Sequence, residues 1–355
     1  MEIGSEYWLE KIYKGNLKIE EKDNQILFMS GRTAIDYAID LIEKHKKVKN
    51  VYMPSYCCSS MLAPFIERNI KIEFYTVSFN GEKFVYDIDS DKDCDIFFAM
   101  NYFGFTINNM DFYIDIFKNK NKNTFIIEDS THSLLSKRIY NGKSDFVVAS
   151  LRKFFPIISG GILIANNTEF IPYIKEDKKD LKSNVNYSTI KEQAMIEKAK
   201  YINKEEINKE EFLGKFKKAN YILDIDYKRY KIDNKSYEIL ENMDLTEIVN
   251  KRKNNSKIIY TFLASQKNIK YIKYNEEDDC PLFIPIILEE NERNELKKYL
   301  VENGVYCPNH WPIPSLITDE KQRKIYNMEL SLICDQRYSE QEIQSYVELI
   351  KNREL

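Results

Sequence analysis

The sequence predicts an α/β protein with a mainly parallel sheet, followed by a smaller α+β unit. In the first half, short apolar runs such as IFFAM (96–100) and GILIA (161–165) alternate with helical periods. Strands that are apolar throughout are typical of a parallel sheet that is buried on both faces. From about residue 240, helical stretches flank the strand-like run FIPIIL (283–288), which indicates a second, α+β unit.

Local patterns justify the individual elements. Residues 30–47 (SGRTAIDYAIDLIEKHKK) carry an apolar stripe at helical spacing, with Ser30 as the candidate cap. Residues 291–304 and 339–352 read as helices, and Gly304 ends the first of them. The large sheet is expected to contain strands at 51–54, 72–77, 96–100, 124–128, 145–150 and 161–165, with helices at 58–68 and near 111–118.

We expect three parts along the chain: an N-terminal arm over 1–23, a large α/β domain over 24–235 and a small α+β domain over 236–355. Within the large domain, residues 168–235 mix acidic and basic side chains in a mostly helical pattern, so we interpret them as solvated helices and a connector. Because the acids offset the bases, this segment does not favour a nucleic-acid patch.

Composition argues against several classes of partner. A net charge of -3 over 355 residues gives no reason to expect nucleic acid or an anionic membrane. The longest apolar runs are strand-sized, and the start MEIGSEYWLEKIYKG lacks the apolar core of a signal peptide, so we expect a cytoplasmic protein. Six cysteines without a CxxC pair predict reduced, buried thiols and no metal site.

Polar residues follow several of the predicted strands. In open parallel sheets, ligands bind beyond the carboxyl ends of the strands. Asp129 follows 124–128, Ser150 and Lys153 follow 145–149, and the Ser30–Gly31 turn opens a helix after a strand-like ILFM. Each has an ordinary explanation: a turn cap, a solvated loop lysine and a helix cap. Together they form a candidate site.

One cofactor requires these parts. Pyridoxal phosphate needs a lysine for a Schiff base, an acid beside the pyridine nitrogen and an anion cradle for the phosphate. A helix N-terminus provides such a cradle. Lys153 lies between apolar runs, and we expect partial burial to lower its pKa so that the amine can act as a nucleophile.

The chain resembles the DegT/DnrJ/StrS family of sugar aminotransferases, within the fold type I pyridoxal-phosphate enzymes, as a divergent branch. The resemblance rests on FMSGRTAIDYAIDLI, VYMPSYCCSSMLAPFIERNIKIEFYTV, AMNYFGF, FIIEDSTHS, SDFVVASLRKFFPIISGG, GVYCPNHWPIP and MELSLICDQRYSEQEI, which occur in the family's order. It implies a fold type I architecture, with a mainly parallel seven-stranded sheet between helices and a smaller C-terminal domain.

The resemblance also implies residue roles. Lys153 would form the Schiff base, Asp129 would pair with the pyridine nitrogen, His132 would contact the phenolic oxygen and Ser150 would help to hold the phosphate. The residues of the opening turn, Gly31, Arg32 and Thr33, would lie under the phosphate. For the Arg32 side chain, an exit to solvent is an equal alternative.

The chain departs from the family pattern where an aromatic residue usually stacks on the cofactor ring. Cys58 stands at that position, and Tyr56, Tyr102 or Phe103 could replace the missing ring. The serine also lies three residues before the lysine, whereas five is common in sugar aminotransferases. The family segment through which the partner subunit contacts the phosphate is not clearly recognisable.

Two C-terminal residues have two readings each. His310, beside Trp311, fits either a substrate cleft or a buried aromatic pair. Arg337 fits either an anchor for a substrate carboxylate or a structural ion pair, and we favour the ion pair.

The resemblance implies an aminotransferase that passes nitrogen from an amino acid such as glutamate to a keto-sugar, nucleotide-linked in this family, in amino-sugar or surface polysaccharide biosynthesis. It also implies a homodimer. The alternatives are another fold type I enzyme, such as a decarboxylase, aldolase or acyl-transferase, and a binding or regulatory protein without the cofactor. The absence of the usual stacking aromatic residue is the main support for a protein without the cofactor.

Overall fold

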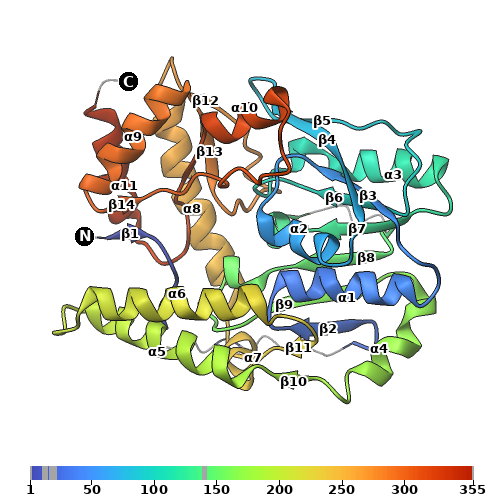
Figure 1. Ribbon diagram of the computed structural model, residues 1–355. Coiled ribbons are helices and arrows are strands. Elements are labelled where there is room, and N and C mark those ends of the chain that lie inside the picture. The colour runs from blue at the N-terminus through green and yellow to red at the C-terminus, as the bar shows by residue number, and fades with distance from the viewer. Residues whose placement is uncertain (1, 10–14, 16–21, 138–141, 354–355) are drawn as a thin grey trace.

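A ten-stranded sheet forms the centre of the large unit in the computed structural model, which describes residues 2–9, 15, 22–137 and 142–353 (Figure 1). Across the sheet the order is β10 (Lys182–Ser183), β11 (Tyr230–Lys231), β2 (Gln25–Phe28), β9 (Gly161–Ala165), β8 (Phe146–Ala149), β7 (Phe125–Asp129), β6 (Ile96–Met100), β3 (Asn50–Pro54), β4 (Lys71–Phe79) and β5 (Phe84–Asp87).

The seven strands from β2 to β4 form the predicted sheet. Neighbouring pairs among β8, β7, β6, β3 and β4 are parallel, and β9 alone runs the other way, between β8 and β2. The prediction of a mainly parallel sheet is therefore confirmed. The strands β5, β10 and β11 extend it at its two sides, and the last two are too short to give a sequence signal.

The first helix follows the predicted pattern. α1 (Gly31–Glu43) begins after Ser30, whose hydroxyl accepts a hydrogen bond from the Thr33 amide at 3.1 Å, and its apolar stripe is buried. α1 packs against β8 and β9, so its N-terminus lies near the residues that follow β8. The other helices of this part are α2 (Ser59–Ile66), α3 (Met110–Lys120) and α4 (Ile171–Asp177).

The charged segment predicted as a helical connector contains two long helices, α5 (Val185–Ile202) and α6 (Lys209–Ile225), which pack side by side (Figure 1). Their inner faces join a buried cluster that includes Tyr187, Met195 and Phe216. Lys191 and Lys198 of α5 are also buried. The segment is therefore a packed helical pair, with both charged and apolar side chains such as Tyr221 exposed on its outer surface.

The C-terminal part is an α+β unit, as predicted. Its antiparallel sheet has the order β12 (Lys270–Tyr271), β13 (Ile284–Ile287) and β15 (Glu329–Leu332). Its helices are α8 (Leu245–Leu263), α9 (Glu290–Glu302), α10 (Glu320–Met328) and α11 (Glu340–Lys351). The division proposed at residue 236 falls inside α7 (Asn234–Glu241) and stays a prediction.

The N-terminal segment lies against the C-terminal unit. β1 (Ile3–Gly4) pairs in parallel with β14 (Val305–Tyr306) (Figure 1). Of the arm predicted over 1–23, residues 1, 10–14 and 16–21 lie outside the described residues. No helix in the described part of the chain is both long and apolar enough to cross a bilayer.

Candidate functional site

A cavity of about 320 Å³ lies where β2, β7 and β8 end; we call it the sheet-edge cavity. Because these strands are parallel, the residues that follow them meet at one side of the sheet. The predicted site residues among its lining are Gly31, Arg32, Cys58, Asp129, His132, Ser150 and Lys153.

The α1 N-terminus forms one end of the cavity. A Cβ atom on Gly31 would lie 3.1 Å from the Ser150 Cβ, so glycine allows the first turn to approach Ser150 closely. The Ser150 hydroxyl is buried and has no hydrogen-bond partner among the described residues. Ser30 caps the Thr33 amide, which leaves the Gly31 and Arg32 amides at the positive end of the helix.

Thr33 and the Arg32 side chain serve the fold at this turn. Thr33 does not line the cavity, and its hydroxyl contacts the Tyr227 carbonyl at 2.8 Å and the Ser30 hydroxyl at 2.9 Å. The Arg32 guanidinium turns to α6, where it pairs with Asp224 at 2.7 Å. Because the Ser30 hydroxyl binds the Thr33 amide, Arg32 is the one of these two residues whose backbone amide remains at the helix N-terminus for an anion.

Asp129 is a buried carboxyl at the end of β7. Its Oδ1 accepts a hydrogen bond from the Thr131 amide at 2.8 Å. Burial raises the pKa of Asp129 to about 6, while the hydrogen bonds from Thr131 and the charge of Lys153 oppose that rise. A cation in the cavity would favour its ionised form.

His132 lines the same cavity one turn after Asp129. Its Nδ1 accepts a hydrogen bond from the Phe103 amide at 3.1 Å, so the proton of the neutral ring is on Nε2. Burial, with the charges of His310 and Lys153, lowers the pKa of His132 well below its ordinary value. His132 is therefore a neutral hydrogen-bond donor.

Lys153 ends the 3₁₀ turn Leu151–Lys153 after β8 and borders the sheet-edge cavity. Its side chain is exposed in the single chain, so the partial burial expected for it is not found there. The apolar runs on both sides are buried strands, but the turn between them projects the lysine out of the sheet. Lys153 also borders a second cavity, described below.

Of the four residues considered for stacking on the cofactor ring, only one lines the sheet-edge cavity. Cys58 is half-buried and lines the cavity. Tyr56, Tyr102 and Phe103 are fully buried and absent from the cavity lining, which makes them unsuitable as stacking partners. Trp311, from the C-terminal unit, lines the cavity with its ring centroid 5.7 Å from that of His132.

Several residues of the site carry no sequence signal. Glu6 of the N-terminal segment lines the cavity and pairs with Lys191 at 2.9 Å. Desolvation of the Glu6 carboxyl is outweighed by the Lys191 charge, which lowers the pKa of Glu6 to about 2. Lys198 donates to the Glu6 backbone carbonyl. Two buried lysines of α5 thus hold this segment at the site, across 185 positions of sequence for Lys191 and 192 for Lys198.

A second cavity of about 390 Å³, which we call the arm cavity, adjoins the first. Glu6, Tyr7, Arg152 and Lys153 border both cavities. The C-terminal unit adds His310 and Arg337 to the lining, among others. Arg337 pairs with Asp335 at 2.7 Å, and both side chains are buried, which confirms the structural ion pair.

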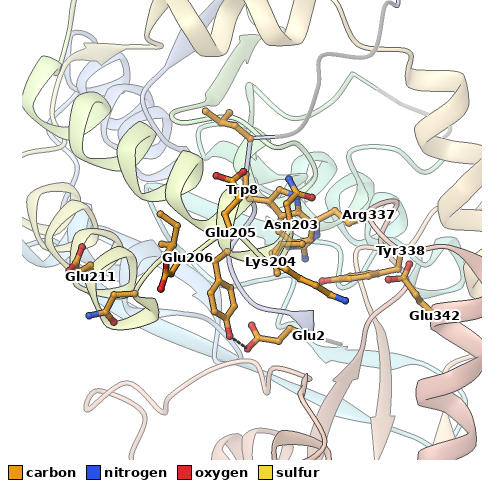
Figure 2. A pocket seen from close by; sticks show the side chains of 16 residues that line it. Glu2, Trp8, Asn203, Lys204, Glu205, Glu206, Glu211, Arg337, Tyr338 and Glu342 are labelled. Atoms are coloured by element: carbon orange, nitrogen blue, oxygen red, sulfur yellow. Dashed lines mark hydrogen bonds between the residues drawn. The ribbon is translucent and has the colours of Figure 1, made fainter.

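A larger cavity, of about 1480 Å³, shares Arg337 with the arm cavity but shares no lining residue with the sheet-edge cavity (Figure 2). Glu2 and Trp8, the end of α5, the loop to α6 and the C-terminal unit line it. None of the predicted cofactor-site residues is among its lining. We therefore assign the candidate site to the sheet-edge cavity.

Comparison with known proteins gives structural relatives alone. Neither a protein-family model nor a curated protein sequence matches the chain. The aminotransferase PseC of Helicobacter pylori, involved in the biosynthesis of pseudoaminic acid, superimposes with a TM-score of 0.68 at 13% identity, covering 100% of this chain and 99% of that one.

Two further structures are similar. The sugar aminotransferase CalS13 of Micromonospora echinospora has a TM-score of 0.65 at 11% identity and covers 93% and 87% of the two chains. The GDP-4-keto-6-deoxy-D-mannose-3-dehydratase of E. coli, with bound hydrated PLP, has a TM-score of 0.65 at 13% identity and covers 92% and 87%. These relatives establish that the chain has their fold.

The burial of Asp129 predicts a stability effect. The pKa of Asp129 in the folded chain is about 6 instead of 3.8. Between pH 3.8 and 6 the folded chain therefore binds more protons at this group than the unfolded chain does. Because of this difference, the contribution of Asp129 to stability falls as the pH rises through that range. Asp129→Asn should therefore raise the free energy of unfolding of the ligand-free chain at pH 7, by up to about 3 kcal/mol.

Urea unfolding at pH 5, 6 and 7 would measure this effect. The gain from Asp129→Asn should increase with pH. Asp91→Asn, at an aspartate that is 76% exposed, should change stability by less than about 0.5 kcal/mol at each pH. Destabilisation by Asp129→Asn at pH 7 would contradict the raised pKa.

Proposed function

We propose that this chain is a pyridoxal-phosphate-dependent aminotransferase that passes an amino group from an amino acid, such as glutamate, to a keto-sugar. The observation that carries the proposal is that Asp129, Ser150, Lys153 and the α1 N-terminus line one cavity. An acid, an amine and an anion cradle are the groups that this cofactor requires of a protein.

The cavity offers features that fit the cofactor. The Ser150 hydroxyl is buried and finds no hydrogen-bond partner in the described part of the chain, and it lies beside the Gly31 turn, where a side chain would fill the space. A phosphate there would accept hydrogen bonds from Ser150 and from the first-turn amides of α1. Asp129, whose pKa burial raises, would be paired with a cationic ring nitrogen.

Bound pyridoxal phosphate would supply an electron sink for the breaking of a substrate Cα–H bond. The Asp129 carboxylate would keep a proton on the pyridine nitrogen. His132 would donate its Nε2 proton to the phenolic oxygen. The Lys153 Nζ would hold the cofactor before reaction and would then accept the Cα proton and return it as a general acid.

The keto-sugar is supported by what the structural relatives have in common. CalS13 is named a sugar aminotransferase, and the E. coli relative acts on a nucleotide-linked keto-sugar by its name, although it is a dehydratase. One fold therefore supports different reactions on related molecules. We propose transamination because Lys153 provides an amine for the proton transfer at the cavity, and we propose a nucleotide-linked acceptor for this chain.

Lys153→Ala tests the proposed amine. Purified wild-type protein supplied with pyridoxal phosphate should show visible absorption that survives desalting and should convert the cofactor to pyridoxamine phosphate on addition of glutamate. Lys153→Ala should lose the covalently retained cofactor and reduce the conversion by at least about 10³-fold. Lys217→Ala, at an exposed lysine of α6, should behave as wild type. An unchanged spectrum in Lys153→Ala would contradict the proposal.

Ser150→Ala tests the proposed phosphate cradle against a matched control. Loss of a hydrogen bond to a charged group should weaken pyridoxal-phosphate affinity about 10- to 100-fold, as measured by equilibrium dialysis. Ser133→Ala removes another buried hydroxyl that has no partner among the residues the structure describes, but Ser133 does not line the cavity, so affinity should not change. Equal effects of the two substitutions would argue against a phosphate at Ser150.

We also propose a homodimer. Val185 of α5 and Tyr221 and Ile225 of α6 are 72%, 62% and 64% exposed, and α6 also lines the cavity through Leu223. A second copy on this face would cover apolar surface and enclose the exposed Lys153. Light scattering after gel filtration should give twice the mass of one chain, and Tyr221→Lys with Ile225→Lys should give monomers. A fully active wild-type monomer would contradict the dimer.

A further inference from the structure

Three buried polar residues of the C-terminal unit, His310, Glu329 and Ser331, are joined by hydrogen bonds, and His310 lines the arm cavity. Glu329 and Ser331 point to the same side of β15, and both are fully buried. Glu329 accepts from the His310 backbone amide at 2.7 Å and from the Ser331 hydroxyl at 2.5 Å. The Ser331 Oγ lies 2.9 Å from the His310 Nδ1.

The loop that carries His310 is fixed to this strand. The Ser331 amide donates to the Pro308 carbonyl at 2.8 Å, two residues before His310. The rings of Phe103 and Phe283 lie 5.3 and 5.1 Å from the imidazole, by centroid. The position of the imidazole ring is therefore set by contacts from three sides.

The direction of the hydrogen bonds determines the tautomer of His310. A hydroxyl has one proton, and Ser331 gives it to Glu329, because a carboxylate can only accept. The Ser331 Oγ must then accept from the His310 Nδ1, so the neutral imidazole carries its proton on Nδ1. This leaves Nε2 without a proton, the opposite of His132, whose Nδ1 accepts.

Two basic side chains, Lys297 and Arg293, lie in the surroundings of Glu329. Burial and the charge of Arg293 lower the pKa of Lys297, and the Glu329 carboxylate opposes them, so Lys297 lies within electrostatic reach of Glu329. Arg293 and Glu329 also both affect the pKa of Tyr56, which Glu329 raises and Arg293 lowers.

The bare Nε2 is accessible from the arm cavity. His310 lines this cavity together with Lys153. The described residues offer its Nε2 no hydrogen-bond partner, and this atom is not among the buried polar atoms that lack one. A molecule in the arm cavity, with its reacting carbon at Lys153, would therefore meet an acceptor nitrogen.

An acceptor nitrogen distinguishes the two substrates of the proposed reaction. The amine of the amino-acid donor is consumed at the reacting centre, and the remaining polar groups of glutamate are carboxylates, which only accept hydrogen bonds. A sugar carries hydroxyls, which can donate. We propose that His310, held with Nε2 unprotonated by the positioning residues Ser331 and Glu329, recognises a hydroxyl of the keto-sugar in the arm cavity; this rests on the proposed function.

The tautomer can be tested without any turnover. The chain has three histidines, and His45 is exposed, so ¹⁵N-histidine labelling gives a simple spectrum with an internal reference. Long-range ¹H–¹⁵N spectra should show His310 protonated on Nδ1 and His132 on Nε2. In Glu329→Gln, the amide oxygen would accept from the His310 backbone and the amide nitrogen would donate to Ser331, so the His310 proton should move to Nε2.

Ser331→Ala is the second variant, since it removes the connection and keeps the Glu329 contact to the backbone. It should leave His310 as a mixture of tautomers. If His310 of the wild type were protonated on Nε2, or if the spectrum were unchanged in both variants, Ser331 and Glu329 would not set the tautomer of His310, and the inference would be overturned.

Recognition of the sugar is tested in the two half-reactions. His310→Asn keeps an amide near the Ser331 hydroxyl and leaves nothing at the position of Nε2. It should lower kcat/KM for a keto-sugar acceptor about 10- to 100-fold and leave the glutamate half-reaction within about twofold. His310→Gln, whose amide reaches the position of Nε2, should restore part of the loss.

The acceptors would be a panel of UDP-, dTDP- and GDP-linked 4-keto-6-deoxyhexoses, and binding would also be followed at the His310 Nε2 resonance. That resonance should shift with the active sugar and remain unchanged with glutamate. Equal losses in both half-reactions, or a shift with glutamate alone, would overturn the inference. A wild-type protein that converts neither glutamate nor any of the sugars would refute the proposed function instead. The tautomer spectra would still show whether Ser331 and Glu329 set the tautomer of His310, because they need no turnover.

Discussion

The close contact between Gly161 and the Ser30–Gly31 turn determines the geometry of the site. A Cβ on Gly161 would lie 2.2 Å from the Ser30 carbonyl, which no side chain could accommodate. With glycine there, the end of β2 passes directly beside the start of β9, and the α1 N-terminus points at Ser150. The cradle at the sheet edge depends on this backbone contact, which the antiparallel insertion of β9 makes possible.

The site keeps groups that are unfavourable in the ligand-free chain. Asp129 is a carboxyl with a raised pKa, and no group within the described ranges hydrogen-bonds to the Ser150 hydroxyl. Both lower stability until a cation and an anion occupy the cavity. A chain that retains such groups trades stability for a preorganised site, which is a common feature of binding pockets.

Three separate parts of the chain complete the candidate site around Lys153. The sheet contributes Asp129 and Ser150, the N-terminal segment brings Glu6, and the C-terminal unit brings His310 and Trp311. Buried lysines of α5 hold the N-terminal segment, while the hydrogen bonds to Glu329 hold the loop of His310. The two histidines carry opposite tautomers. His132 therefore presents a hydrogen-bond donor to the sheet-edge cavity, and His310 presents an acceptor to the arm cavity.

The sequence alone determined the mainly parallel sheet, the α1 helix and the location of Asp129, Ser150 and Lys153, because these depend on local periodicity and on the rule that ligands bind at strand ends. The tertiary structure alone decided that Lys153 is exposed, that Thr33 belongs to the helix cap and that Tyr56, Tyr102 and Phe103 lie outside the cavity. It also brought Glu6 to Lys191 and His310 to Glu329. Such contacts join distant segments, and a side chain's surroundings depend on packing from all sides, which no local pattern encodes.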